Sequence, residues 1–266
     1  MLRLQHVQKT FNPGASNEKV ALRGVTLTIA EGEFATVIGS NGAGKSTLLN
    51  VIAGTHLPDA GNIYLGDHDI TWMPEHRRAA WIGRVFQDPL LGTAGSMTIE
   101  ENLAMAAARG RRRRMRLAVN QAMRAFFREE LARLGLGLED RLDTRVRFLS
   151  GGQRQALALL MAILQRPLLL LLDEHTAALD PRTARQILEL TERVVREHRL
   201  TTLMVTHNLE HALSMGDRTI MMHEGEAVLD VSGAERAAHT VDSLLQEFAR
   251  VRGERLVDDK ILTARA

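Results

Sequence analysis

The feature that most constrains this chain is a glycine loop that follows a short apolar run and precedes a helix. The apolar run is Phe34–Ile38, and the loop reads Gly39-Ser40-Asn41-Gly42-Ala43-Gly44-Lys45-Ser46. Apolar residues at helical spacing then predict a helix over residues 45–53. The loop fits the pattern G-x-x-x-x-G-K-[ST], whose backbone N–H groups and lysine hold phosphate groups. A chance glycine turn is the alternative, but the order of strand, loop and helix favours a phosphate-binding α/β domain.

This loop supplies most of the predicted nucleotide-binding residues. Gly42 and Gly44 let the backbone wrap closely around phosphate groups, and the helix that begins near Lys45 adds the positive end of its dipole. Lys45 is expected to reach the β- and γ-phosphates of a nucleotide, and the hydroxyl of Ser46 to coordinate Mg²⁺. The nucleotide-binding residues predicted in the loop are Gly39, Ser40, Asn41, Gly42, Ala43, Gly44, Lys45, Ser46 and Thr47.

Helices and strands alternate in the second half of the chain. Residues 168–172 and 201–205 read as buried strands, and residues 153–165 and 182–198 read as helices. Such alternation predicts a parallel sheet covered by helices.

Two other regions differ in character from this alternating part. Residues 2–39 read as strands and turns, and residues from about 90 to 148 are rich in Ala, Arg, Leu and Met with helical periodicity. We therefore predict one domain over residues 1–236, followed by a C-terminal helix and charged tail at 237–266. Within that domain we expect a core of residues 1–89 and 149–232 and a helical subdomain at about 90–148.

Residues with functional potential stand just past the ends of three predicted strands. These are Gly39, Asp173 and His207. Ligands of open α/β sheets bind along the rim formed by the carboxyl ends of parallel strands. Glu174 follows Asp173 at the same rim, where a carboxylate is well placed to accept a proton. Taken alone, the Asp-Glu pair reads as a solvated helix start and a lone histidine as structural, but their position favours a functional role.

The segment Leu149-Ser150-Gly151-Gly152-Gln153 is a second phosphate-handling motif. Ser150 is a favoured N-cap residue, and the glycines leave N–H groups uncovered at the start of the next helix. Such a helix end is a second anion-binding site, in addition to the glycine loop. A single nucleotide scarcely needs two separate anion-binding sites from one chain. With both motifs, the chain resembles the ATP-binding-cassette (ABC) ATPases over nearly its whole length. The resemblance implies a P-loop NTPase core with an antiparallel β subdomain and a helical insert.

The resemblance also implies roles for isolated side chains. Asp173 would bind Mg²⁺, Glu174 would accept a proton from the attacking water, and His207 would contact that water and the γ-phosphate. Gln87 matches the Q-loop glutamine, which binds the water and Mg²⁺ in the family; an exposed loop amide is the alternative. Phe11 stands where the family often places a ring stacked on adenine, although a core phenylalanine would also fit.

A dimer follows from the same resemblance. Ser150-Gly151-Gly152-Gln153 would serve the ATP held by the opposite subunit, so that two cassettes pack head to tail around two ATP molecules. The segment Ala177-Ala178-Leu179-Asp180 matches the D-loop of the family, in which Ser-Ala-Leu-Asp is usual. From this loop, Asp180 would contact the opposite subunit. The aspartate is retained, but one hydroxyl contact is lost.

The implied function is that of the ATP-binding and ATP-hydrolysing subunit of a membrane transporter. The segments at residues 173–178 and 221–225 look like those of bacterial importers of small organic solutes such as amino acids. Partners would be permease subunits, a second copy of the chain or a paralogous cassette, and a solute-binding protein, at the cytoplasmic face of the membrane. The alternatives are a soluble ABC ATPase of an assembly or regulatory complex, as in iron–sulfur assembly, and the ATPase of an exporter.

Composition argues against several other functions. The chain has no cysteine, which excludes disulfides and cysteine nucleophiles, and its 34 basic and 32 acidic residues give a net charge of +2, which argues against nucleic acid as a partner. The longest apolar block, residues 168–172, is far too short to span a bilayer, so membrane association is expected through a partner. The arginine run at residues 111–114 reads as a solvated helix start; phospholipid headgroups, acidic partner loops or nucleic acid are the alternatives.

Overall fold

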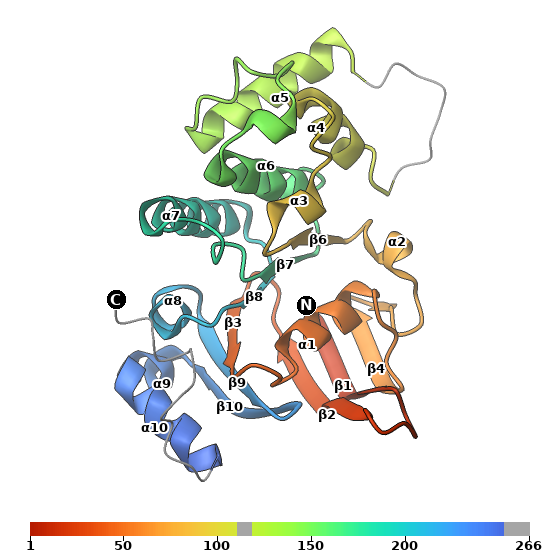
Figure 1. The fold of residues 1–266 in the computed structure, drawn as a ribbon, viewed down its shortest axis with the longest axis vertical. Coiled ribbons are helices and arrows are strands. Elements are labelled where there is room, and N and C mark those ends of the chain that lie inside the picture. Colours follow the sequence, from red (N-terminus) through yellow and green to blue (C-terminus); the bar gives the residue numbers. More distant parts are fainter. Residues whose placement is uncertain (111–118, 253–266) are drawn as a thin grey trace. The chain divides into compact units, whose positions relative to one another are not determined.

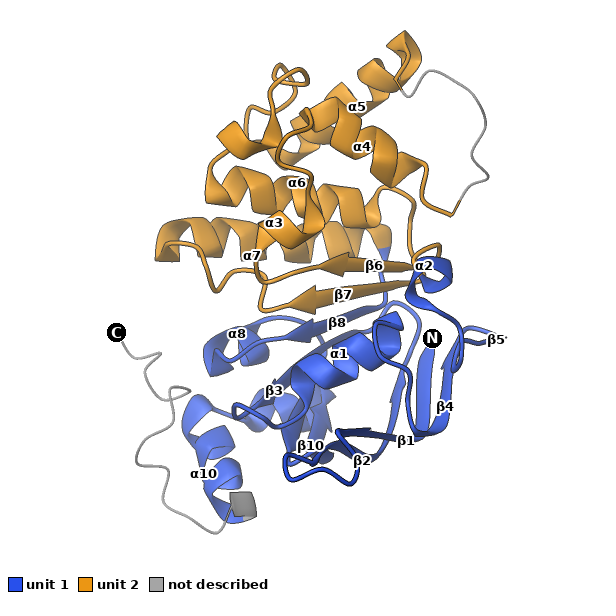
Figure 2. Ribbon diagram, turned by 45° about the vertical axis from the view of Figure 1, so that its right-hand side comes forward, with its two compact units in different colours: residues 1–78, 199–266 blue, residues 79–198 orange. Residues whose placement is uncertain are grey.

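A computed structural model of the chain describes residues 1–110 and 119–252, which fall into two compact units (Figure 2). Unit 1 combines residues 1–78 with the chain from residue 199 onward, and unit 2 comprises residues 79–198. The arginine run at residues 111–114 lies outside the described residues, as does the tail beyond residue 252. Unit 1 therefore carries the glycine loop, and unit 2 carries the motif that begins at Ser150.

The first sheet of unit 1 is antiparallel, with the strand order β2-β1-β4-β5; Figure 1 labels β2, β1 and β4. Leu4 of β1 lies opposite Leu27 of β2 and Ile63 of β4, and all three side chains are buried, so one face of this sheet is part of the core. The predicted antiparallel β subdomain is thus confirmed. Its strands are β1 (Leu2–Phe11), β2 (Lys19–Ile29), β4 (Ala60–Leu65) and β5 (His68–Asp69).

The second group of strands in unit 1 surrounds β3 (Phe34–Gly39), whose six residues are all buried. β3 pairs in parallel with β8 (Thr202–Val205) and with β9 (Arg218–His223), and β10 (Glu226–Ser232) pairs antiparallel with β9. A strand buried on both faces is apolar along its length, which explains why the sequence of β3 shows no polar alternation.

The helices of unit 1 pack against these strands. α1 (Lys45–Ala53) contacts β2 and β3, α8 (Leu209–Ser214) contacts β3 and α10 (Val241–Arg252), and α9 (Gly233–Ala238) contacts β9 and β10. The short helix α2 (Glu75–Arg78) ends the first segment of the unit. A buried apolar cluster joins β3, β9, α8 and α10; its members are Ile38, Leu209, Ala212, Met221, Leu244 and Phe248.

Unit 2 is built around α6 (Gly151–Ile163), which contacts β6 and the helices α3, α4, α5 and α7. β6 (Ile82–Val85) and β7 (Leu169–Asp173) pair in parallel. Nine of the thirteen residues of α6 are buried, as the centre of a helical layer requires. The helices are α3 (Pro89–Gly92), α4 (Ile99–Ala107), α5 (Gln121–Leu134), α6 (Gly151–Ile163) and α7 (Pro181–His198), and a 3₁₀ turn covers Val146–Phe148.

Most predicted elements correspond to observed ones. The helix predicted at 45–53 is α1, the strand predicted at 168–172 is β7 displaced by one residue, and the described part of the insert contains the helices α4 and α5. The compact units divide the chain elsewhere than predicted, because β6, α6, β7 and α7 group with the insert. The core and subdomain boundaries therefore remain a prediction. Within residues 1–110 and 119–252, no helix combines the length and the apolar character that crossing a bilayer requires.

Candidate nucleotide-binding elements and signature helix

The glycine loop runs from the end of β3 into α1 and depends on glycine at two positions. Gly39 has a φ of 154°, and Gly44, the N-cap residue of α1, has a φ of 100°. A Cβ atom on Gly44 would come within 2.5 Å of the carbonyl oxygen of Ala21, and one on Gly39 would overlap the carbonyl oxygen of Met222. Any side chain at either position would therefore push the loop away from the strands behind it.

Lys45 is enclosed by the loop that precedes it. The residue is 7% exposed, and its Nζ donates to the carbonyl oxygens of Gly39 at 2.6 Å and Ser40 at 3.0 Å. Gly42 and Ser46 of the same loop are exposed. Phosphate oxygens are stronger partners for an ammonium group than carbonyl oxygens are, so they can replace these two bonds. Together with the N-terminus of α1, this arrangement fits the phosphate chain of a nucleotide.

The turn between β9 and β10 supports the glycine loop from behind. The N–H of Gly225 donates to the carbonyl oxygen of Ala43 at 3.0 Å. On its other side, the N–H of Arg23 donates to the carbonyl oxygen of Gly225, and the Arg23 Nε donates to that of Glu224, both at 2.9 Å. In the sequence, the Glu-Gly pair at 224–225 signals a turn but gives no indication of what that turn contacts.

Two further side chains of unit 1 bear on the nucleotide. Phe11, at the end of β1, is half-buried, and its ring meets that of His56 edge-on with centroids 5.2 Å apart. Its partial exposure sets it apart from the fully buried phenylalanines of the core. Lys19, which is not among the predicted site residues, has its Nζ 3.6 Å from the position that a Cβ on Gly42 would take. A second ammonium group therefore lies beside the glycine loop.

His207 emerges at the same edge of the sheet as the glycine loop. Val37 of β3 and Val205 of β8 are paired in parallel register, so Gly39 and His207 each follow a paired valine by two residues. His207 is exposed, and the backbone after it is fixed because the side chain of Asn208 accepts from the N–H of His211 at 2.9 Å. Unit 1 thus brings together two of the three predicted strand-end residues.

Asp173 is the last residue of β7, as predicted, and has an arginine partner in unit 2. The Arg84 Nη2 lies 3.3 Å from the Asp173 Oδ2, and both side chains are mostly buried. The guanidinium carbon of Arg84 also lies 4.6 Å from the centre of the Phe86 ring. Arg84 is not among the predicted site residues; its only signal in the sequence is a single charge within the otherwise apolar strand β6.

Glu174 follows Asp173 in a left-handed backbone conformation, with a φ of 44°. Its carbonyl oxygen accepts from the N–H of Ala177 at 2.9 Å, which closes a turn directly after the strand. The side chain is partly exposed. A carboxylate at this turn therefore lies at the end of a buried strand and remains accessible.

Gln87 lies between β6 and α3 and is exposed. The segment around it is anchored on both sides. Gln155 of α6 donates from its Nε2 to the carbonyl oxygen of Phe86 at 3.3 Å, and the side chain of Asp88 accepts from the N–H of Leu90 to cap α3. The segment around Gln87 thus connects β6 to α6 at the centre of the helical layer.

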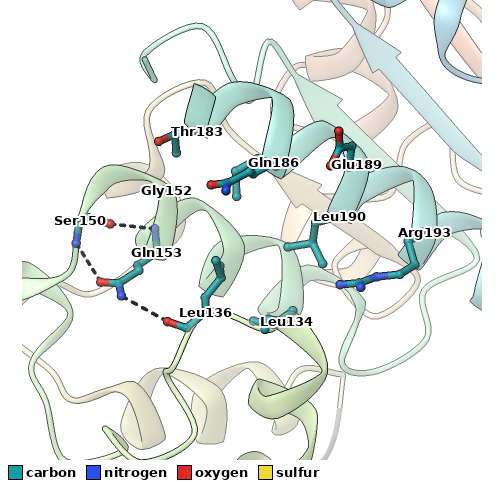
Figure 3. A pocket seen from close by; sticks show the side chains of 12 residues that line it. Leu134, Leu136, Ser150, Gly152, Gln153, Thr183, Gln186, Glu189, Leu190 and Arg193 are labelled. Carbon is teal, nitrogen blue, oxygen red and sulfur yellow. Dashed lines mark hydrogen bonds between the residues drawn. The ribbon is translucent and has the colours of Figure 1, made fainter. Parts of the chain in front are cut away.

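The helix α6, here called the signature helix, begins at the predicted Ser150 motif with a complete capping box. The Ser150 Oγ accepts from the N–H of Gln153 at 3.2 Å, and the Gln153 Oε1 accepts from the N–H of Ser150 at 3.3 Å, as Figure 3 shows. The Gln153 Nε2 also donates to the carbonyl oxygen of Leu136 at 3.4 Å. Ser150 and Gly151 are exposed, so this helix end is accessible to an anion.

A cavity of about 530 Å³ lies along this end of the signature helix (Figure 3). It is bordered by the turn at residues 134–136 and by the first turns of α7, including Thr183 and Gln186. Asp180 precedes α7, and its Oδ1 accepts from the N–H of Thr183 at 3.1 Å. The hydrogen bonds from the Thr183 side chain and backbone lower the pKa of the exposed Asp180 carboxyl.

The predicted site residues thus fall into two sets, each placed within its own unit. Unit 1 holds the glycine loop, Phe11 and His207. Unit 2 holds Gln87, Asp173 and Glu174 together with the signature helix and Asp180.

Comparisons with known proteins agree with this geometry. Residues 22–177 match the ABC transporter family. The chain is 45% identical to the tyrosine transport ATP-binding protein of Clostridioides difficile, over 93% of this chain and 98% of that protein. It is 35% identical to the methionine import ATP-binding protein MetN of Corynebacterium diphtheriae, over 93% of this chain and 70% of that protein. A solved dimer of the ATP-binding cassette MJ0796 in a post-hydrolysis state with ADP and Pi aligns with a TM-score of 0.74 at 31% identity, covering 87% of this chain and 98% of that one.

The chain therefore belongs to the ABC transporter family and is an ATP-binding cassette of that family. The fold is that of the P-loop NTPase cassettes, and the chain is an ATP hydrolase of this class. The predicted resemblance and fold class are confirmed. Membership of the family also implies a membrane-embedded partner, because the relatives are ATP-binding subunits of transporters.

Proposed function

We propose that this chain is the ATP-hydrolysing subunit of an importer for a small organic solute such as an amino acid. The observation that carries the proposal is the 45% identity to a tyrosine transport ATP-binding protein over 98% of that protein's length. The similarity to a methionine import protein supports the same class of solute. Relatives named for transport and import argue against a soluble assembly ATPase and against an exporter.

In this function, unit 1 binds the nucleotide. The loop at residues 39–47 holds the phosphate chain, and Lys45 exchanges its two carbonyl partners for β- and γ-phosphate oxygens. The ring of Phe11 stacks on adenine. His207 contacts the γ-phosphate from the end of β8, at the sheet edge where the loop also begins.

Unit 2 supplies the acidic groups for hydrolysis. Asp173 and Gln87, with Ser46 of the glycine loop, provide the oxygen ligands that Mg²⁺ prefers. When bound, Mg²⁺ would neutralise part of the negative charge on the phosphate oxygens. Glu174 accepts a proton from the attacking water, for which its accessible carboxylate at a strand end is suited.

The signature helix acts on the ATP of a second cassette, either another copy of this chain or a paralogue. Its capped N-terminus binds the γ-phosphate, and Asp180 contacts the facing subunit. The solved dimer of the similar cassette MJ0796 supports this pairing. Closure of the dimer drives a permease at the cytoplasmic face of the membrane, with a solute-binding protein delivering the solute. Moving such an equilibrium from 1:99 to 99:1 takes about 5.5 kcal/mol, which a few charge-assisted hydrogen bonds can supply.

The variant Glu174→Gln tests the proposal, with Lys45→Ala as its counterpart. We expect Glu174→Gln to retain ATP, to hydrolyse almost none of it, and to elute as a dimer on size-exclusion chromatography only when ATP and Mg²⁺ are present. Lys45→Ala should instead be impaired in ATP binding, the step before hydrolysis, and should bind ATP weakly. Full hydrolysis by Glu174→Gln would refute its role as the base, and a monomer in saturating ATP would refute the shared site. Uptake of labelled tyrosine and methionine by cells with and without the chain tests the solute class.

A further inference from the structure

The connection between β7 and α7 contains a buried histidine that the proposed chemistry does not use. His175 follows Glu174 and is 2% exposed. Its Nε2 lies 3.1 Å from the Oγ1 of Thr191, a fully buried residue of α7. The Thr191 hydroxyl itself donates to the carbonyl oxygen of Ile187 at 2.7 Å. Because this bond uses the only hydroxyl proton, the Thr191 oxygen accepts from His175, whose Nε2 therefore carries a hydrogen.

Glu174, next to this histidine, has a backbone conformation that needs support. A φ of 44° lies in the left-handed region, which costs a residue with a Cβ free energy relative to ordinary conformations. Such a residue persists only where the surrounding structure holds it. Two contacts constrain the backbone of Glu174. The N–H of Ala177 donates to its carbonyl oxygen, and the side chain of the following residue, His175, is held by Thr191.

The far end of the same connection is fixed to α7 as well. The N–H of Leu179 donates to the carbonyl oxygen of Thr176 at 3.1 Å, and Asp180 caps the first turn of α7 through Thr183. Residues 174–180 are thus tied to α7 near its start and again at Thr191, more than two turns further on. A change in the backbone conformation of Glu174 would move the adjacent His175 and disturb its hydrogen bond to Thr191.

We propose that the hydrogen bond from His175 to Thr191 positions Glu174 for ATP hydrolysis. It fixes the left-handed backbone of Glu174 and so holds the carboxylate where it accepts the proton of the attacking water. His175 and Thr191 act through Glu174 and are positioning residues. The inference rests on the proposed role of Glu174 as the base.

Two matched pairs of variants of the full-length chain test this inference. Thr191→Val removes the acceptor at nearly constant volume, whereas Thr191→Ser keeps it. His175→Leu removes the donor, whereas His175→Gln keeps an N–H group close to the position of Nε2. We expect Thr191→Val and His175→Leu to lower kcat about tenfold with KM for ATP within about twofold, since a small displacement of a reacting group is costly. Thr191→Ser and His175→Gln should stay close to the parent chain.

The measurements are kcat and KM with ATP and Mg²⁺, ATP affinity without Mg²⁺, and circular dichroism at the assay temperature to establish that each variant is folded. Unchanged kcat in folded Thr191→Val and His175→Leu would overturn the inference, as would a loss of ATP affinity that accounts for the lower rate. An equal loss in Thr191→Ser would also overturn it. Glu174→Gln separates the proposed role of the base from the proposed role of the positioning contact. If Glu174→Gln hydrolyses ATP normally, Glu174 is not the base. If Glu174→Gln is impaired but Thr191→Val and His175→Leu are not, the hydrogen bond from His175 to Thr191 does not position it.

Discussion

Thr183 of α7 lies so close to Gly152 of the signature helix that a Cβ on the glycine would overlap the Thr183 Cγ2. At Gly151, by contrast, a Cβ would stand 3.2 Å from the Cδ2 of Leu179, the end of a flexible side chain. Only the second glycine of the motif is therefore required for the packing of α6 on α7. This requirement is separate from any contact of the motif with phosphate.

Replacing Gly152 with alanine should destabilise the chain through this overlap. Overpacking costs about 1–3 kcal/mol, and the better helix propensity of alanine offsets up to about 1 kcal/mol of it. We therefore expect Gly152→Ala to lower the free energy of unfolding by about 1–2 kcal/mol in urea titrations. Adding Thr183→Ser, which removes the Cγ2, should restore it, and Gly151→Ala should be near neutral. A double variant as unstable as Gly152→Ala would contradict the steric explanation.

The pairing of Arg84 with Asp173 should weaken Mg²⁺ binding. Both side chains are mostly buried, and a fixed positive charge 3.3 Å from a carboxylate oxygen opposes the approach of a dication. If Asp173 is a magnesium ligand, Arg84→Met should lower the half-saturating Mg²⁺ concentration for ATP hydrolysis by about threefold to tenfold. Arg84→Lys, which keeps the charge, is the matched control. A Mg²⁺ titration that is the same for all three chains would show that Arg84 has no influence on the metal.

Arg78 should be among the most important residues for the stability of unit 1. It is fully buried and donates to the carbonyl oxygens of four residues at 2.7 to 2.9 Å. Burial lowers the pKa of Arg78 to about 10, against a smaller opposite effect of Asp69, so the guanidinium remains charged at neutral pH. These acceptors, at the end of α1 and in the turn before α2, are Val51, Ile52, Thr71 and Met73.

Removing this side chain would leave several buried carbonyl groups without their donors. We expect Arg78→Met to lower the free energy of unfolding by about 3–5 kcal/mol, measured by urea titration. Arg77 precedes it on the same short helix and is exposed, so Arg77→Met should change the free energy by no more than about 0.5 kcal/mol. Equal effects of the two variants would mean that the burial of Arg78 contributes nothing specific.

The sequence predicted those parts of the fold and site whose signals are local. The glycine loop, the helix after it and the capped start of the signature helix each follow from a few adjacent residues, and the structure has all three. The positions of Asp173 and His207 at strand ends also followed, because the apolar runs before them mark buried strands. Phosphate-binding motifs are readable for the same reason, since their chemistry needs consecutive backbone groups.

Contacts between residues distant in sequence could not be predicted in the same way. Arg84 and Asp173 are 89 residues apart, and Arg23 and Glu224 are 201 apart, so neither spacing carries a periodic signal. The left-handed backbone at Glu174 is also absent from the sequence pattern, because glutamate has no preference for that conformation. His175 and Thr191 become partners only when the end of β7 and the middle of α7 are placed together.

His211 should make the stability of the chain depend on pH in the mildly acidic range. Burial lowers its pKa, the charge of His207 lowers it further, and Glu210 acts in the opposite direction. In the folded chain His211 therefore stays neutral at a pH where the unfolded chain, with a pKa of about 6.5, already binds a proton. Its contribution to stability is present above about pH 6.5 and is lost as the pH falls toward its folded pKa. Urea titrations between about pH 7.5 and 5.5 should show a smaller loss for His211→Gln than for the parent chain, whereas His76→Gln, at an exposed histidine, should behave like the parent. If His211→Gln loses as much stability as the parent over this range, the pH dependence arises from other groups.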